Sequence, residues 1–118
     1  MKYLCLVYAD ESIYSRMTKE ELGGMVAEYG AVTEDLKRAG HYVGSNRLEP
    51  IGTALTVRVR AGKVSTTDGP YAETKEQLGG YYLLEAKDMT DAVRLAARIP
   101  GARVGAIEVR PVMSVPGV

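Results

Sequence analysis

The 118-residue chain is long enough for one compact domain with a single core, because folding at this length buries somewhat more than about 60% of the unfolded surface. Its 15 basic and 15 acidic residues give a formal net charge of zero, and the basic residues form no run. Nucleic acid is therefore not expected as a partner, since phosphate binding relies on clustered Lys and Arg.

Residues 2 to 8 form a nearly continuous apolar run that ends at Asp10 and Glu11, which predicts a buried strand because the run is too short for a helix core. The run is also shorter than the apolar core of a signal peptide, and no small-residue cleavage pattern follows it. We therefore expect a cytoplasmic protein without a membrane segment. Cys5, the only cysteine, has no disulfide partner and is expected to be an inert core residue.

An amphipathic helix is predicted from Thr18 onward. Thr18 and Glu21 have the spacing of a capping box, and Gly40 stands just past the last turn, where a left-handed cap is needed. The apolar residues recur at three- and four-residue steps along one helical face. They are Leu22, Met25, Val26, Tyr29, Val32 and Leu36.

The remaining elements follow from changes of period and from turn residues. Residues 41 to 48 look extended, residues 55 to 67 alternate as a hairpin around Ala61-Gly62-Lys63, and residues 79 to 86 form a buried strand. A second helix is predicted from about Asp88 to Pro100, and a last strand from 104 to 112. The inner face of that second helix is assigned to Ala92, Val93, Ala96 and Ile99.

The order of elements predicts an α+β fold, with a ferredoxin-like βαββαβ core and an inserted β-hairpin, in one domain over residues 1–118. Two helices cover only one face of such a sheet. The first strand nevertheless carries apolar side chains on both faces, with Leu4 and Leu6 opposite Cys5 and Val7. A contiguous apolar face in water marks an interface, so we expect a homodimer packed sheet to sheet.

Residues 68 to 76, Asp-Gly-Pro-Tyr-Ala-Glu-Thr-Lys-Glu, combine many ionisable groups with rigid backbone punctuation. Gly69 can adopt backbone angles closed to other residues, and Pro70 fixes its own φ. The carboxylate of Asp68 should therefore sit at a stiff, defined bend.

This segment, with Leu78-Gly79-Gly80-Tyr81 after it, resembles the signature of DGPF-type proteins in the YCII-related family, with Tyr71 in place of the phenylalanine. The likeness runs from the first strand to Val112. It implies the dimeric α+β barrel architecture that this family shares with muconolactone isomerase and small monooxygenases. It also implies a link to extracytoplasmic-function sigma factors in bacteria.

Asp68 and His41 are the candidate catalytic residues. The carboxylate could accept a proton or orient an imidazole, although it could equally bond backbone N–H groups of its own turn. His41 is the only histidine, and imidazole is the side chain whose ordinary pKa lies near neutrality. It either meets Asp68 as an acid/base dyad or interacts with the C-terminal dipole of the helix before it. In shorter YCII-like members the suspected histidine lies on the first helix, which has none here.

The candidate substrate-binding residues are Tyr71, Glu73, Lys75 and Arg47. The first three follow Asp68 along the same loop, and Arg47 could hold a substrate carboxylate bidentately. Solvated surface positions are the alternative for each of them. No metal or other cofactor is expected, because one histidine and scattered carboxylates give no ligand spacing, and the Gly-Gly pairs lack the pattern of phosphate loops.

Three hypotheses follow. The protein is a cofactor-free acid/base enzyme of isomerase or lyase type acting on a small organic molecule, or a ligand-binding or regulatory homodimer without turnover. The third hypothesis is a structural dimerisation module in which the motif only closes the fold. Catalysis requires Asp68 to approach another titratable group in a pocket, whereas a binding module requires a pocket without such a pair.

Overall fold

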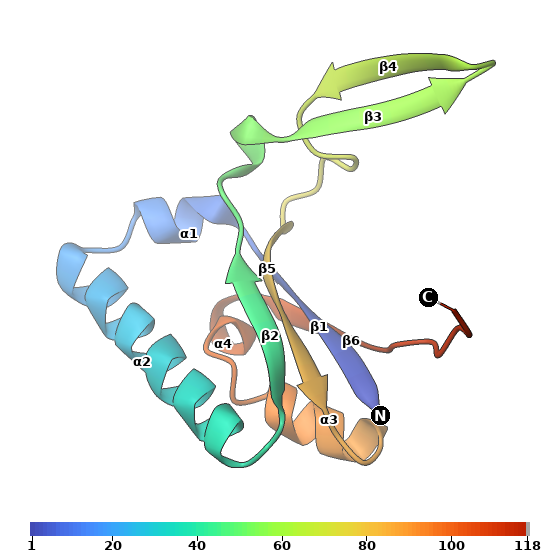
Figure 1. The fold of residues 1–118 in the computed structure, drawn as a ribbon. Helices are drawn as coiled ribbons and strands as arrows, with labels where there is room; N and C mark the ends of the chain where they lie inside the picture. Colours follow the sequence, from blue (N-terminus) through green and yellow to red (C-terminus); the bar gives the residue numbers. More distant parts are fainter. Residues whose placement is uncertain (118) are drawn as a thin grey trace.

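The computed structural model describes residues 1–117 and is built on a four-stranded antiparallel sheet in the order β2-β5-β1-β6 (Figure 1). Its strands are β1 (Lys2–Ala9), β2 (Tyr42–Arg47), β5 (Gln77–Glu85) and β6 (Ala106–Pro111). Two longer helices pack on one face of this sheet, α2 (Lys19–Arg38) and α3 (Met89–Ala96). The core elements follow the βαββαβ order, so the predicted ferredoxin-like α+β fold is confirmed.

Helix α2 begins and ends where its capping residues predict. The Thr18 hydroxyl accepts from the Glu21 backbone N–H, and the Glu21 carboxylate accepts from the Thr18 N–H. Gly40 follows the helix with a φ of 80°. The predicted apolar face is wrong at Val26, which is 60% exposed. The contact stripe runs through Tyr29, Val32 and Leu36, and Val26 lies beside that line.

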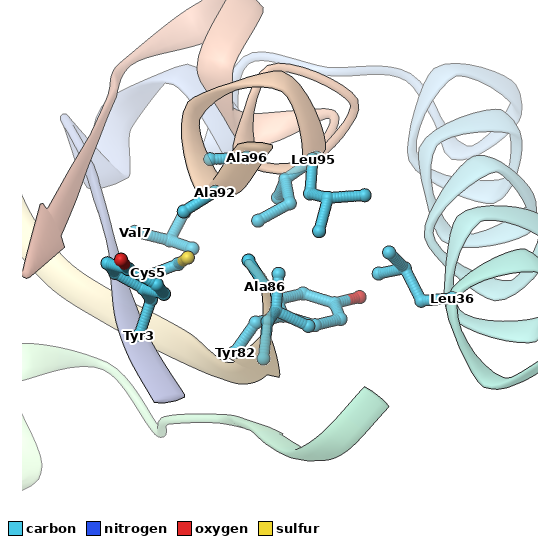
Figure 2. Packing of buried hydrophobic residues seen from close by; sticks show 11 residues of the cluster. Tyr3, Cys5, Val7, Leu36, Tyr82, Ala86, Ala92, Leu95 and Ala96 are labelled. Atoms are coloured by element: carbon cyan, nitrogen blue, oxygen red, sulfur yellow. The ribbon is translucent and has the colours of Figure 1, made fainter. Parts of the chain in front are cut away.

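The core lies between the helices and one face of the sheet, where Figure 2 shows Tyr3, Cys5 and Val7 of β1 directed at the helices. On α3 the predicted inner residue Val93 is wrong, because it is 51% exposed while Leu95 is 1% exposed. Helical spacing explains the difference. The buried residues follow steps of three and four along one face, and Val93 does not. They are Ala92, Leu95, Ala96 and Ile99.

A cluster of tyrosines joins α2 to the sheet. The Tyr29 and Tyr82 rings are stacked with their centroids 6.4 Å apart, and the Tyr82 hydroxyl lies 2.7 Å from the Thr33 hydroxyl. The Tyr29 hydroxyl accepts a bond from the Gly101 backbone N–H at 3.1 Å. The chain at Gly101 therefore packs closely on α2.

Short helical turns correct the predicted boundaries. The strand expected at 104 to 112 begins at Ala106, because α4 (Gly101–Val104) occupies the preceding residues. Pro100 stands at the start of this turn with helical angles, which suits the fixed φ of proline. Two more turns were not predicted, α1 (Glu11–Ser15) after β1 and the 3-10 helix η1 (Ile51–Thr53).

The predicted hairpin is confirmed and forms a separate two-stranded sheet of β3 (Leu55–Arg60) and β4 (Lys63–Asp68). We call these two strands the arm. Ala61 and Gly62 close it with φ values of 50° and 75°, a two-residue loop of the kind that matches strand twist. Figure 1 shows the arm projecting from one end of the main sheet, on the side away from α2.

The face of the main sheet opposite the helices is apolar and carries no helix. The ladder pairs Leu4 with Leu83 and Leu6 with Tyr81, which places these side chains together on that face, and each is partly exposed. The alternation predicted for the first strand is therefore confirmed. No helix within residues 1–117 is both long and apolar enough to cross a bilayer.

Candidate functional site

The signature turn is fixed to the base of the arm through its backbone. β4 ends at Asp68, and Gly69 follows with a φ of 102°, in the region that favours glycine. The Gly69 N–H donates to the Ala54 carbonyl at 2.8 Å, and the Thr56 hydroxyl donates to the Gly69 carbonyl at 3.0 Å. The bend expected from Asp-Gly-Pro is therefore present and held at both sides of Gly69.

The Asp68 side chain takes no part in holding this turn. It is exposed, and its carboxylate accepts no hydrogen bond from any residue between 1 and 117. It lines neither of the two pockets described below. The alternative in which Asp68 bonds its own turn is thus not what the structure shows.

The side chain of Gln77, the first residue of β5, holds the loop at residues 71–76 through hydrogen bonds. Gln77 is 8% exposed, and its Nε2 donates to the carbonyls of Ala72 at 3.1 Å and Thr74 at 2.7 Å. One buried amide thus connects two points of the loop. No sequence pattern indicates this role, because a glutamine before an apolar run is indistinguishable from a solvated residue.

The end of this loop opens on a groove of about 1050 Å³, which we call the signature groove. Four segments meet there: the end of β1, helix α1, the loop at residues 71–76, which we call the signature loop, and the start of β6. Its lining residues are Tyr8, Asp10, Ile13, Arg16, Thr74, Lys75, Glu76, Ala106, Ile107 and Glu108.

Two cations of the groove are free to bind a ligand. Neither Arg16 nor Lys75 forms an ion pair or a side-chain hydrogen bond with the part of the chain described. Asp10 lies near both. Its pKa is lowered chiefly by the bond that its carboxylate accepts from the Ser12 N–H at 2.9 Å, and the charges of Lys75 and Arg16 lower it further. Asp10 is thus engaged as the cap of α1.

The groove combines these cations with apolar surface. Ile13 and Ile107 line it beside the Tyr8 ring, while Glu108 is held by Arg110 at 2.7 Å. Arg and Lys donate charge-assisted bonds to carboxylates and phosphates, and an apolar lining favours an organic ligand body. The arrangement suits binding of an organic anion and contains no histidine.

His41 lies elsewhere, at the start of β2. Its Nδ1 is 2.8 Å from the Glu85 carbonyl oxygen, in a second, shallower depression of about 450 Å³ that Asp91 and Arg94 also line. The Asp91 carboxylate accepts from Arg94 and from the Lys87 N–H. These bonds lower the pKa of Asp91, and His41 adds a smaller effect. Asp91 therefore has a structural role that already explains its burial.

The structure does not bring His41 and Asp68 together within one chain. His41 precedes β2 at one end of the main sheet, whereas Asp68 lies at the base of the arm beyond the other end (Figure 1). The physical reason is the length and direction of β2, which carries the chain away from His41 along the sheet before the arm begins.

Comparison with known proteins identifies the family. The sequence model of the YCII-related domain matches residues 1–116. The chain belongs to the YCII-related family. An uncharacterized protein of Rhizobium meliloti (strain 1021), R00369, is 39% identical over 113 residues, which cover 94% of this chain and 91% of that protein. The resemblance drawn from the signature segment is therefore confirmed.

The other candidate binders of this YCII-related protein lie apart from the groove. Tyr71 is 83% exposed, and the Arg58 guanidinium lies 5.7 Å from the centre of its ring. Glu73 is exposed and outside the lining. Arg47, in β2, is exposed and outside the lining; burial raises the pKa of Tyr29 to about 12, and the charge of Arg47 opposes that rise only weakly. Among the predicted binders, the groove contains Lys75 only.

The YCII-related signature thus marks the groove through Lys75 and its neighbours, while other lining residues were missed. Arg16 follows a five-residue helix that is too short to show a periodic pattern. Tyr8 was assigned only to a buried strand, and Glu108 only to the last strand. Their convergence depends on the pairing of β1 with β6, which no local pattern specifies.

Proposed function

We propose that this YCII-related protein is a homodimer that binds a small organic anion in the signature groove without turning it over. The observation that carries the proposal is that two cations without an ion-pair partner among residues 1–117 line one groove. They are Lys75 of the signature loop and Arg16 at the end of α1. A carboxylate or phosphate between them would receive charge-assisted hydrogen bonds from both.

The other lining residues restrict the ligand. Ile13, Ile107 and Tyr8 favour a hydrocarbon or aromatic body beside the anionic group. Asp10 and Glu76 contribute negative charge to the same lining, which disfavours a polyanion. The best fit is therefore a ligand with one anionic group and a neutral or cationic remainder.

The dimer of this proposal packs through the helix-free face of the main sheet. That face presents the partly exposed side chains of Leu4, Leu6, Tyr81 and Leu83, and such an apolar surface in water is typical of an interface. A ligand-binding dimer also suits the regulatory role, beside extracytoplasmic-function sigma factors, that the likeness to DGPF-type proteins suggests.

An acid/base enzyme is the second candidate, and the observation that favours it is the unengaged carboxylate of Asp68. A free carboxylate on a rigid turn could act as a base toward a substrate held nearby. His41 of the same chain does not lie near Asp68, so this candidate relies on a proton partner other than His41.

The test is binding of a panel of small organic anions, aromatic and aliphatic carboxylates and monophosphates, measured by thermal shift and then by calorimetry. Wild type is compared with Lys75→Gln and Arg16→Gln, and Lys63→Gln at the start of β4 is the matched control. A ligand at 100 times its Kd should raise the free energy of unfolding by about 2.7 kcal/mol. Each groove variant should weaken binding tenfold or more.

Three outcomes decide between the candidates. Binding lost in the groove variants and kept in Lys63→Gln and Asp68→Asn supports the binding function. Equal losses in Lys75→Gln and Lys63→Gln, or no bound anion in the whole panel, contradict it. Chemical conversion of a ligand that stops in Asp68→Asn supports the enzyme instead.

A further inference from the structure

The arm and the signature groove are connected through the base of the arm. β3 begins at Leu55, just after η1, and β4 ends at Asp68, where the signature turn begins. The ladder pairs these two residues with each other, so both ends of the arm meet at its base. Segments that are bonded to this base can therefore act on both strands.

The β3 end of the base is bonded to the helix that carries Arg16. The Ile51 N–H, at the start of η1, donates to the Glu11 carboxylate at 2.9 Å. Glu11 is the first residue of α1, and Arg16 follows its last residue. The Ala54 N–H, just before β3, in turn donates to the Ile51 carbonyl at 3.1 Å. Glu11 lies outside the lining of the groove, so its bond holds the base of the arm and is not part of the anion site.

The β4 end of the base continues into the loop that carries Lys75. The Gly69 N–H donates to the Ala54 carbonyl at 2.8 Å, which ties the signature turn to the residue that ends η1. Pro70 follows with a fixed φ, and the Gln77 amide holds the signature loop beyond it at two carbonyls. Chain connections and hydrogen bonds thus join Lys75 to α1 by way of the base of the arm.

The arm is an element whose stability a small change at its base can alter. Among residues 1–117, β3 and β4 pair only with each other, and a two-stranded hairpin alone is at best marginally stable in water. An element that opens at little cost in free energy responds to changes in the freedom of its ends. The arm is therefore suited to respond to the segments that hold it.

An anion in the groove would restrict both ends of the arm at once. When Arg16 and Lys75 bind the same anion, α1 is joined to the signature loop across the groove. One of these segments holds η1 and the other continues the signature turn. Bringing the ends of the hairpin together then costs less conformational entropy, so the paired state of the arm gains stability.

From these contacts we propose that occupation of the signature groove stabilises the arm, and that Glu11 is the positioning residue through which α1 acts on it. The inference rests on the anion site of the proposed function. Because coupling between two sites is reciprocal, a stable arm also raises the affinity of the groove for its anion. The order of the arm then reports whether the groove is occupied.

The first experiment replaces the anion by a covalent bridge across the groove. Arg16→Cys combined with Lys75→Cys is joined within one chain by a short bismaleimide, and the same variant blocked at both thiols with N-ethylmaleimide is the unlinked control. Cys5 is 0% exposed and should not react. Amide exchange at residues 55–68 should be slower in the linked protein by a factor of about three or more. Equal exchange in the two proteins, or a linker that cannot join the two positions, overturns the inference.

Variants of Glu11 test the route of the coupling. In the linked protein, Glu11→Ala should abolish the protection of the arm, because the Ile51 N–H loses its acceptor. Glu11→Gln keeps a side-chain oxygen that can accept this bond and should retain the protection. Equal exchange in these two variants contradicts the role of Glu11.

Benzoate, which has one carboxylate on an aromatic ring, tests the same coupling with an anion. It should slow exchange at residues 55–68 of the wild type, and Glu11→Ala should weaken its binding by about the same factor, because the coupling is reciprocal. Benzoate binding that leaves the arm unprotected overturns this inference and leaves the binding function standing. Protection of the arm by the covalent bridge, with no anion of the panel bound, contradicts the binding function alone.

Discussion

At the residue scale, the contact between Gly101 and Tyr29 limits what position 101 can hold. A Cβ at Gly101 would lie 2.7 Å from both the Tyr29 hydroxyl and Val7 Cγ1. We expect Gly101→Ala to lower the free energy of unfolding by about 1–3 kcal/mol, the usual cost of overpacking a core. Urea unfolding measures this.

Gly24→Ala is the matched control, because Gly24 is in α2 and a Cβ there would meet nothing within 4 Å. That substitution should stabilise the protein by about 0.5–1 kcal/mol, since alanine is the better helix former. Equal effects of the two substitutions would contradict the close contact.

Three acidic groups predict a loss of stability in alkali. Burial raises the pKa of the Cys5 thiol from 9.0 to about 11 and that of the Tyr29 hydroxyl from 10.0 to about 12, and it also raises the pKa of the Tyr82 hydroxyl. The folded chain holds these protons more tightly, so their contribution is complete below pH 9 and is lost between pH 9 and 12. The urea midpoint should therefore fall over this range.

Cys5→Ala separates the thiol from the two tyrosines, because it removes the group with the lowest ordinary pKa and should delay the fall by about one pH unit. A midpoint that stays constant from pH 8 to 11 would contradict the burial of these protons.

The role of a single residue was predictable where it follows from the chemistry of its side chain or from the backbone conformation that its position requires. Cys5 was assigned to the core, and Gly69 was assigned to a conformation that few other residues adopt. The partners of a side chain were not predictable. Gln77 donates to carbonyls three and five residues before it, and Arg16 lines the same groove as Lys75 only because distant segments converge.

At the element scale, the two hydrogen bonds of the Gln77 amide to the signature loop, which we call the clamp, predict that loop motion depends on Gln77. Gln77→Ala should speed amide exchange at residues 72–76 and weaken binding in the groove, because Lys75 would lose its fixed position. Exchange in the ligand-free protein, measured by NMR, is the direct readout. A residue whose only role was to contact the ligand would not alter exchange in the free protein.

Glu73→Ala is the control for the clamp, since Glu73 is an exposed residue of the same loop. Similar exchange rates in the two variants would show that the loop is held by other contacts.

Long elements were predicted and short turns were not. Helix α2 carries a capping box, a glycine cap and several turns of apolar residues, so its limits follow from local signals. α1 and α4 contain five and four residues, fewer than two turns, and leave no period to detect. The displaced start of β6 follows directly from α4.

At the scale of the whole molecule, the helix-free sheet face predicts stability that depends on concentration. If two copies cover this face, the Tm should rise with protein concentration, because dimerisation stabilises only the folded chain. Leu6→Asp, on that face, should remove the dependence. Thermal unfolding over a hundredfold range of concentration measures it.

Val93→Asp is the matched control, since Val93 is 51% exposed on the helix side. It should leave the dependence intact. A wild-type Tm that is the same at all concentrations would contradict the interface.

The two edges of the main sheet have a consequence for how copies can associate. β2 pairs with β5 through an irregular register between Tyr42 and Gly44, and β6 ends at Pro111, which has no N–H to donate. Neither edge is a long, regular row of free donors and acceptors. These features of the main sheet disfavour regular edge-to-edge pairing between the main sheets of separate copies, and with it growth into a fibre along that direction.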